Sequence, residues 1–536
     1  WAPYRSAGNG GVLQIWDESP LSNGTTAAGA EGTSVFSILG GRAAVEETLQ
    51  LQALNVTETN QPKVVDIDSI QGVTVKSHPF KEMLAGHAGG QLQLAKYAPQ
   101  DRFFLYIGKP TAVASMLDAG APFIASVGSA LTGNALNYGI EKRYLKRLGM
   151  NRDQLNLILN SGLVQEMALF CPDLFFIDGT EITVVAKVDQ PELLQRLISL
   201  LNPATTETGS IVKLPGAEGQ PAYMAMRKGL LFLGTNRSEL EKSLALAKAN
   251  GKGSLADSDE FRYMLTKLGV NENTRGYAYF SDPFVRRLVG PRMKIAQRRR
   301  MLAKSQMEAL TACSMLARID APGSNLDVEQ LKANGYLTTT WTATDFSIDD
   351  TGLVHSETYG TLTDMRSLSE IPIQDITSDE ASAYKNYLDN YSRYWRRFFD
   401  PIAVRLDEPT PDQLELQTFI LPLVDNSIYN GLRVAMETER KNQSLSVPLI
   451  EPTPVVKFSM NLSEQGWQTI TENFSDLFTL YSGAGSALLD DLGPSVHLAI
   501  FDSDPVIALG SGDVFGSFGS SFSGGNADAM LILPVA

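Results

Sequence analysis

The chain has 536 residues, 43% of them hydrophobic and 20% charged, which is the composition of a folded globular protein of roughly two to four domains. Its formal net charge is -15, from 60 acidic against 45 basic residues, and this argues against a general nucleic-acid binder, which needs a positive surface to meet phosphates. The cysteines, Cys171 and Cys313, are too few for a disulfide framework or a structural zinc site. Both lie in apolar patterns typical of small buried hydrophobes, and a bond between them is the alternative.

The two ends of the chain predict that it belongs to a longer protein. It begins at Trp1 without an initiator methionine, and the residues before Ala536 have the pattern of a strand. We therefore expect a processed form that has lost an N-terminal signal or anchor, with a natural sequence that continues past Ala536. The chain has no apolar run of about 18 residues, so the sequence predicts no transmembrane segment.

The first region, residues 1–96, is rich in Gly, Ser, Thr, Asn and Gln. Its short apolar pieces alternate with loop-like stretches, and residues 64–68 and 73–75 have strand patterns. We expect an extended, irregular region that packs on a neighbour. The alternative is an edge or partner-binding segment.

Residues 97–290 predict a first α+β domain. Residues 167–188 indicate a hairpin that includes the aromatic and β-branched run Phe175-Phe176-Ile177 and turns at Asp178-Gly179, followed by a helix from Pro191 to Leu201. A second hairpin turns at residues 227–229, and Ser238 with Glu241 suggests a capping box for the next helix. Strand-turn-helix patterns begin and end the domain, over 102–117 and 275–288, and further helices are expected before 160 and over 259–268.

Residues 291–337 predict a helical insert. Residues 291–320 form one long amphipathic pattern, and a shorter helix follows within 326–337. The first half of the long helix carries the strongest local concentration of basic residues: Arg292, Lys294, Arg298, Arg299, Arg300 and Lys304. We consider these residues as a surface for an anionic lipid, a polyanion or an acidic partner. The alternative is a solvated helix face that offsets the excess of carboxylates.

Residues 338–536 predict a second α+β domain, incomplete at its C-terminal end. A hairpin over 336–360 turns at residues 349–352, and an aromatic-rich helix covers about 378–399. Strand patterns at 455–470 and 495–506 repeat the arrangement of the first domain. The predicted fold class is therefore α+β, with repeated strand-hairpin-helix units that form antiparallel sheets covered by helices, plus the long helical insert.

The sequence offers few residues for chemistry. Ser382 and Lys385 match the Ser-x-x-Lys element, but the Lys-Thr-Gly partner is missing, and Gly251–Ser254 resembles only the end of a phosphate loop. The four histidines lack ligand spacing, and the carboxylate pairs lack EF-hand spacing; these pairs are Asp66/Asp68, Asp349/Asp350, Asp490/Asp491 and Asp502/Asp504. We assign no catalytic, cofactor-binding or metal-binding residue, and we expect no cofactor.

A family resemblance lies in residues 98–337. The phrases APQDRFFLYIGKP, YFSDPFVRRLVGPRMKIAQRRR and VEQLKANGYL resemble large uncharacterised extracytoplasmic proteins of planctomycete-type and related bacteria. The resemblance covers under half of the chain and includes no catalytic motif. It implies a secreted or membrane-anchored bacterial protein in the periplasm or at the cell surface.

The function predicted from these observations is a non-enzymatic extracytoplasmic protein, a structural or protein-binding component of an envelope assembly. Its expected partners are other envelope proteins, with contact to a membrane surface as a further option and the oligomeric state left open. Two alternatives remain. One is a hydrolase with dispersed catalytic residues, and the other is a ligand- or glycan-binding module that uses aromatic residues such as Tyr391, Tyr394 and Trp395.

Overall fold

The computed structural model separates the chain into two compact units. The first comprises residues 1–29, 44–119 and 137–421, and the second 30–43, 120–136 and 422–536. The structure describes residues 53–59, 62–87, 89–111, 140–176, 178–201, 206–208, 211–216, 221–321, 326–339, 341, 343–391, 401–410, 413–421, 456–461, 495–500 and 529–532. These residues form helices and antiparallel sheets, so the predicted α+β class is confirmed.

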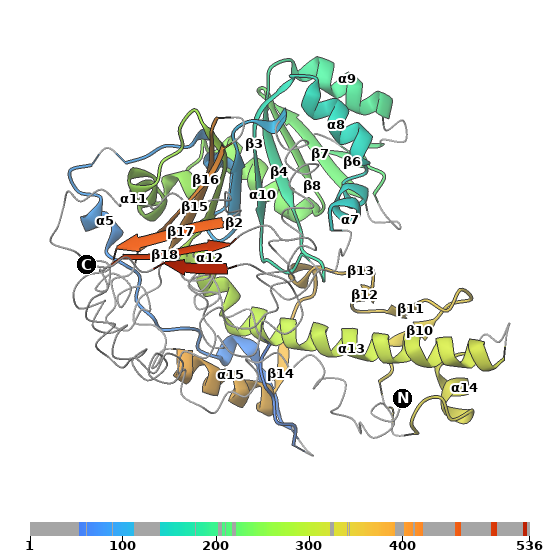
Figure 1. The fold of residues 1–536 in the computed structure, drawn as a ribbon. Helices are drawn as coiled ribbons and strands as arrows, with labels where there is room; N and C mark the ends of the chain where they lie inside the picture. Colours follow the sequence, from blue (N-terminus) through green and yellow to red (C-terminus); the bar gives the residue numbers. More distant parts are fainter. Residues whose placement is uncertain are drawn as a thin grey trace. The chain divides into compact units, whose positions relative to one another are not determined.

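The first unit is built on a ten-stranded sheet in which every neighbouring pair is antiparallel (Figure 1). In sheet order the strands are β16 (Gln413–Ile420), β15 (Ile402–Thr410), β9 (Thr274–Phe280), β2 (Phe103–Ile107), β3 (Val164–Cys171), β4 (Thr183–Val188), β8 (Leu230–Gly234), β7 (Ala222–Arg227), β6 (Ile211–Leu214) and β5 (Thr206–Thr208). The hairpin β7–β8 turns through Lys228 and Gly229, both with positive φ, as the sequence predicts.

The main core lies on one face of this sheet. Large side chains of the central strands, such as Phe104, Phe232 and Tyr277, point to the same side and are fully buried. Helices cover them with residues such as Leu240 and Phe261: α5 (Phe80–Met83), η2 (Gln93–Tyr97), α10 (Arg237–Lys248), η4 (Leu255–Asp257) and α11 (Asp259–Lys267). Strands β4 and β8 are buried along almost their whole length, so other parts of the chain also shield residues that do not face this core.

The remaining helices of the sheet region lie in its connections. Between β2 and β3 the chain forms α7 (Ile140–Arg147) and α8 (Arg152–Asn160), and after β4 it forms α9 (Pro191–Leu201), which matches the prediction. After β9 it forms α12 (Asp282–Leu288), whose buried Phe284 packs on Phe103 and Phe280.

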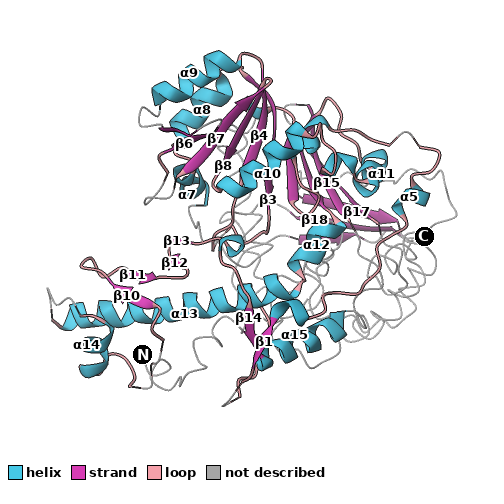
Figure 2. Cartoon of the chain, turned by 180° about the vertical axis from the view of Figure 1, so that it is seen from behind, coloured by secondary structure: helices cyan, strands magenta, loops and turns pink. Residues whose placement is uncertain are grey.

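The predicted long helix is present from its first residue to its last as α13 (Pro291–Asp320). Its second half has a core of its own, in which Met307 and Leu310 pack with Leu331 and Val354. The partners of α13 there are α14 (Val328–Ala333) and a four-stranded sheet, β10 (Phe346–Ile348), β11 (Val354–Ser356), β12 (Gly360–Thr361) and β13 (Asp364–Met365) (Figure 2). The predicted turn at 349–352 is correct, but the strand before it is shorter than predicted.

The first half of α13 packs with smaller elements of the same unit. These are α15 (Ser378–Asn390), the two-stranded sheet of β1 (Val64–Asp66) and β14 (Asp375–Thr377), and the turns η1 (Ile67–Ser69) and η5 (Leu368–Glu370). Within the described ranges, no helix is both long enough and apolar enough to span a bilayer.

In the second unit the structure describes a three-stranded antiparallel sheet. Its strands are β17 (Val456–Asn461), β18 (Ser495–Ile500) and β19 (Ala529–Ile532), with β18 in the centre. Strands β17 and β18 lie within the predicted stretches 455–470 and 495–506, and the other residues of these stretches lie outside the described ones. Some residues named from the sequence lie outside the described residues: Tyr394, Trp395 and the pairs Asp490/Asp491 and Asp502/Asp504.

Three local expectations are corrected. Phe175 and Phe176 lie outside β3 and β4, in a connection, where neighbouring Gly179 accepts a hydrogen bond from Arg300 of α13. Helix α10 is capped by Asn236, whose side chain accepts from the amide of Glu239, and not by Ser238. Strands β15 and β16 complete the sheet of the first unit, so the chain divides after residue 421 and not near 338.

Candidate binding pocket at the start of the long helix

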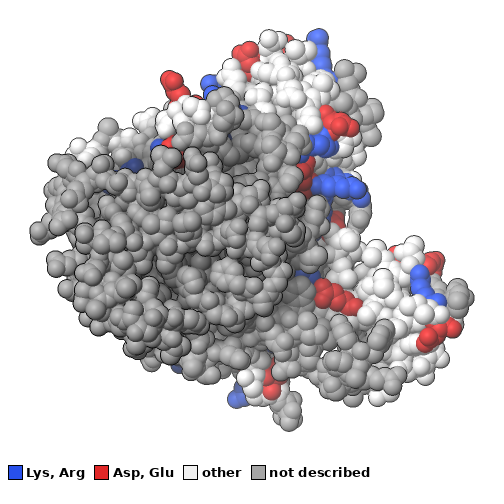
Figure 3. Space-filling model, in the orientation of Figure 1, with Lys and Arg blue, Asp and Glu red and all other residues white. Residues whose placement is uncertain are grey.

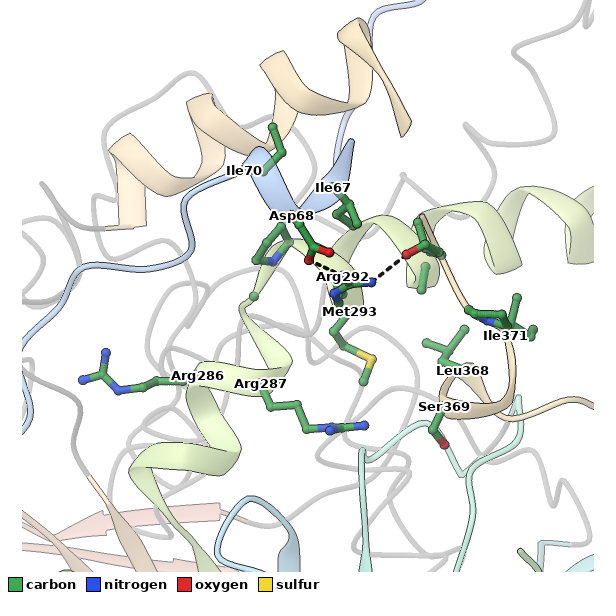
Figure 4. A pocket seen from close by; sticks show the side chains of 15 residues that line it. Ile67, Asp68, Ile70, Arg286, Arg287, Arg292, Met293, Leu368, Ser369 and Ile371 are labelled. Atoms are coloured by element: carbon green, nitrogen blue, oxygen red, sulfur yellow. Dashed lines mark hydrogen bonds and ion pairs between the residues drawn. The ribbon is translucent and has the colours of Figure 1, made fainter. Parts of the chain in front are cut away.

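A pocket of about 470 Å³ lies where α13 begins (Figure 4). Three segments far apart in the sequence line it: residues 67–70, residues 286–296 and residues 368–373. Most of the lining is apolar, including Ile67 and Met293, and the polar exceptions are Asp68, Ser369 and three arginines: Arg286, Arg287 and Arg292. An apolar pocket with a few convergent polar groups has the usual character of a ligand site.

Each of the three arginines has a carboxylate partner. Arg286 Nε donates to Asp282 at 2.6 Å, and Arg292 donates to Asp68 and, at 2.6 Å, to the carbonyl of Ile373. Arg287 Nη1 donates to Asp101 at 3.3 Å. In Figure 4 the Arg287 side chain extends toward the side of the pocket that Leu368 and Ser369 form.

The N-terminus of α13 adds backbone donors to this environment. The cap residue, Gly290, has no side chain to accept from the first-turn amides, and the first turn contains no acidic residue. The amides of an uncapped first turn have no acceptor within the helix, and they form its positive end.

Close to the pocket, buried charged groups gather at one end of the sheet. Arg102, 2% exposed, donates from Nε and Nη2 to the two oxygens of Glu239 at 2.8 and 2.9 Å. Burial raises the pKa of Glu239, but the hydrogen bonds and charges of Arg102 and Lys242 outweigh it and lower this pKa to about 2. Nearby Glu181 accepts from Asn236 at 2.7 Å, and burial raises its pKa to about 7.

Arg300 joins α13 to the connection between β3 and β4. Its Nη1 donates to the carbonyl of Gly179 at 2.7 Å, and its guanidinium lies 5.4 Å from the centre of the Phe175 ring. Burial raises the pKa of Asp173 in the same connection, against the opposing charges of Arg300 and Arg287. Neither Asp173 nor Glu181 lines the pocket, so these two shifted acids do not form a catalytic pair within it.

The other basic residues predicted as a partner surface also contact groups of their own chain. Arg298 pairs with Glu58 at 3.0 Å, and Lys304 pairs with Asp178 at 2.7 Å. Arg299 donates from Nε and Nη2 to the two carboxylate oxygens of Glu380, at 2.8 and 2.7 Å. These contacts match the part of the structural alternative in which the cluster offsets carboxylates of its own chain, but Lys294 and Arg300 are buried and not solvated. Partner binding by this cluster stays a prediction. On the face drawn in Figure 3, basic and acidic side chains of the described residues are interspersed.

Lys294 is as deeply buried as Arg300, since each is 1% exposed. Its amine lies 5.0 Å from the centre of the Tyr387 ring, and the neighbouring Tyr384 donates to the carbonyl of Val289 at 3.0 Å. Burial lowers the pKa of Lys294 to about 7.

Replacing Lys294 by methionine is expected to stabilise the protein most below pH 7. The folded-state pKa lies below the unfolded value, so wild-type stability is lowest below pH 7 and rises as the pH increases toward 10.5. We expect Lys294→Met to raise the free energy of unfolding by on the order of 3 kcal/mol at pH 6, and by less at pH 9. Urea unfolding at both pH values measures this, with Lys304→Met as the control. An equal gain at both pH values would contradict a buried amine of lowered pKa.

The remaining sequence candidates have structural explanations. Ser382 donates to the carbonyl of Ser378 one turn earlier in α15, at 2.8 Å. Asp349 accepts from the amides of Thr351 and Leu353 in its turn, and Asp66 accepts from the amide of Asp68. Cys171 and Cys313 are both free thiols. Among the described residues, no group of three His, Cys, Asp or Glu side chains is arranged to hold a metal ion.

The pocket was not predicted from the sequence. Arg286, Arg287 and Ser369 were not singled out, and Asp68 was considered only as part of a carboxylate pair. Little in the sequence pointed to the pocket, since Arg286 and Arg287 lie in the last turn of α12, where basic residues are the usual choice.

Comparison with known proteins identified no similar protein. The chain matches no protein-family model, no curated protein and no solved structure.

Proposed function

We propose that the protein is a non-enzymatic, extracytoplasmic protein-binding component of a bacterial envelope assembly, and that it binds a partner through the pocket at the start of α13. The observation that carries the proposal is the lining of this pocket, which combines apolar walls with arginines held by neighbouring carboxylates. Side chains that are oriented before binding lose less conformational entropy when a partner docks. The extracytoplasmic location rests on the sequence resemblance.

Photo-crosslinking in the source cells tests the proposal. Ile70, half-buried in the pocket wall, would be replaced by p-benzoylphenylalanine in the full chain. The matched control places the same residue at Leu157, an exposed apolar position on α8 that does not line the pocket. We expect a reproducible adduct with one envelope protein from position 70 and not from position 157. Identical adducts from both positions, or none from position 70, would contradict pocket-mediated binding.

A further inference from the structure

Among the described residues that line the pocket, Arg287 is the arginine with a buried hydrogen-bond donor that meets no acceptor. Its Nε is buried and has no acceptor, while its side chain remains 29% exposed. Its ion-pair partner, Asp101, is shared with Arg102, whose Nη1 lies 2.6 Å from Asp101, against 3.3 Å for Arg287, and the charge of Arg287 also acts on buried Asp173. Arg102 therefore makes the shorter contact with Asp101. The exposed part of the Arg287 guanidinium can donate to another acceptor.

The other two arginines are committed to the protein. Arg286 donates to both oxygens of Asp282 and, at 2.7 Å, to the carbonyl of Val75. Arg292 joins Asp68 of η1 to the carbonyl of Ile373. Both side chains therefore hold the walls of the pocket in place, and Arg287 is the anchor for an incoming group.

The balance of charge selects a monoanion. Asp68, Asp101 and Asp282 offset the three arginines, so the pocket carries little net positive charge. A phosphate, with nearly two negative charges at pH 7, would meet these aspartates without compensation. A carboxylate has one charge, and its two oxygens match the planar fork of a guanidinium.

The apolar walls require an apolar group next to that carboxylate. Met293, Leu368 and Ile371 border the same space as Arg287 and Ser369 (Figure 4). The last residue of a protein chain supplies both features at once, because its carboxylate and its side chain are attached to the same Cα. Backbone amides such as those at the uncapped start of α13 are a recurrent element in the capture of chain termini.

We infer that the pocket binds the C-terminal carboxylate of a partner protein that ends in an apolar residue, with Arg287 as the anchor. This inference rests on the proposed function, because it names the part of the partner that enters the pocket. Arg286 and Arg292 act as positioning residues.

Calorimetric titration of the full chain with short peptides tests the inference. The probe is acetyl-Gly-Gly-Leu with a free carboxylate, and it is compared with the C-terminal amide and with acetyl-Gly-Glu-Leu-Gly amide, which carries an internal carboxylate. We expect the free acid to bind at least tenfold more tightly than either amide. Equal binding of acid and amide, or preference for the internal glutamate, would overturn the inference.

Variants of the chain assign the contact to the pocket. Arg287→Gln is expected to weaken binding of the acid at least tenfold, whereas Arg237→Gln, in an exposed pair with Glu241, retains it. Because Arg287→Gln alters a partly buried pair, Ser369→Asp provides a second variant at an exposed lining residue. Ser369→Asp is expected to weaken binding several-fold more than Ser369→Asn, a substitution of the same size without charge. Equal effects of these two substitutions would contradict carboxylate binding beside Ser369.

The two proposals can fail separately. If position 70 crosslinks to a partner but the peptide acid shows no preference over its amide, protein binding stands and the C-terminal ligand is wrong. If the acid binds and no partner crosslinks in cells, the ligand chemistry stands and the assembly role is wrong.

Discussion

Replacing Arg102 by methionine is expected to lower the free energy of unfolding by about 3–5 kcal/mol at pH 7. Arg102 and Glu239 are 2% and 5% exposed, and two hydrogen bonds join them. Removing the guanidinium leaves a buried carboxylate with only Lys242, which is 52% exposed, as its cationic partner. Urea unfolding followed by circular dichroism measures the loss.

The dependence on pH and a double variant identify the cause. In the wild-type protein the pKa of Glu239 is lowered to about 2, so its stabilising contribution is present above pH 4.5 and is lost as the pH falls through 2. Without Arg102, burial dominates and raises this pKa, so the deficit of Arg102→Met should shrink between pH 7 and pH 4. Arg102→Met combined with Glu239→Leu should recover most of the stability. A deficit that is the same at both pH values would point to lost packing of the arginine stem.

A matched exposed pair gives the scale for this effect. Arg237 and Glu241 lie one turn apart on α10, at 2.9 Å, and both are 51% exposed. Arg237→Met should therefore cost less than about 1 kcal/mol, because water screens an exposed pair and already solvates both charges.

The elements that the sequence predicts well are those with long local patterns. Helix α13 follows its 30-residue amphipathic pattern from Pro291 to Asp320, and α9 begins at Pro191 as expected. The hairpin β7–β8 has its turn at Lys228-Gly229, where both residues have positive φ. In each case the spacing of apolar residues and the turn chemistry lie within a few neighbouring residues, so no distant contact is needed to specify the element.

Local sequence patterns do not predict which distant strands pair in a sheet. Strand β15 pairs with β9, for example Ala403 with Tyr279, across more than a hundred residues that include α13 and the small sheet. A strand pattern specifies which residues face a core, but not which distant strand lies beside it. This is why a second domain was expected to begin near residue 338, whereas β15 and β16 belong to the first sheet.

The same limit applies to the candidate site. The basic cluster on α13 was visible in the sequence, but its acidic partners come from distant segments: Glu58, Asp68, Asp178 and Glu380. Phe175 and Phe176 are residue types typical of a strand, but they lie in a connection that packs against α13 through Arg300. Tertiary contacts override local propensity at such places.

Replacing Glu260 by glutamine is expected to stabilise the protein at alkaline pH by on the order of 3 kcal/mol. Glu260 is 6% exposed at the start of α11, where one carboxylate oxygen accepts from the hydroxyl of Tyr279 and, at 3.0 Å, from the amide of Asp282. Burial and the nearby charge of Asp282 raise the pKa of Glu260 to about 8, although its hydrogen bonds and Arg286 act in the opposite direction.

The sign of this effect follows from the direction of the shift. A carboxyl group whose folded-state pKa is raised contributes stability that is fully present below pH 4.5 and is lost as the pH rises through 8. Glutamine is neutral throughout and keeps an oxygen that can accept from both donors. Glu260→Gln should therefore match the wild type within about 1 kcal/mol at pH 5 and exceed it at pH 9.

The measurement is the difference in unfolding free energy between variant and wild type at several pH values, which isolates Glu260 because all other titrating groups contribute to both proteins. Glu241→Gln, at a 51% exposed position, serves as the control and should show little change between pH 5 and pH 9. A constant difference for Glu260→Gln over this range would mean that Glu260 is ionised in the folded protein. The carboxylate of Glu260 would then add a second negative charge beside Asp282, and Arg286 in the pocket wall would have to compensate both.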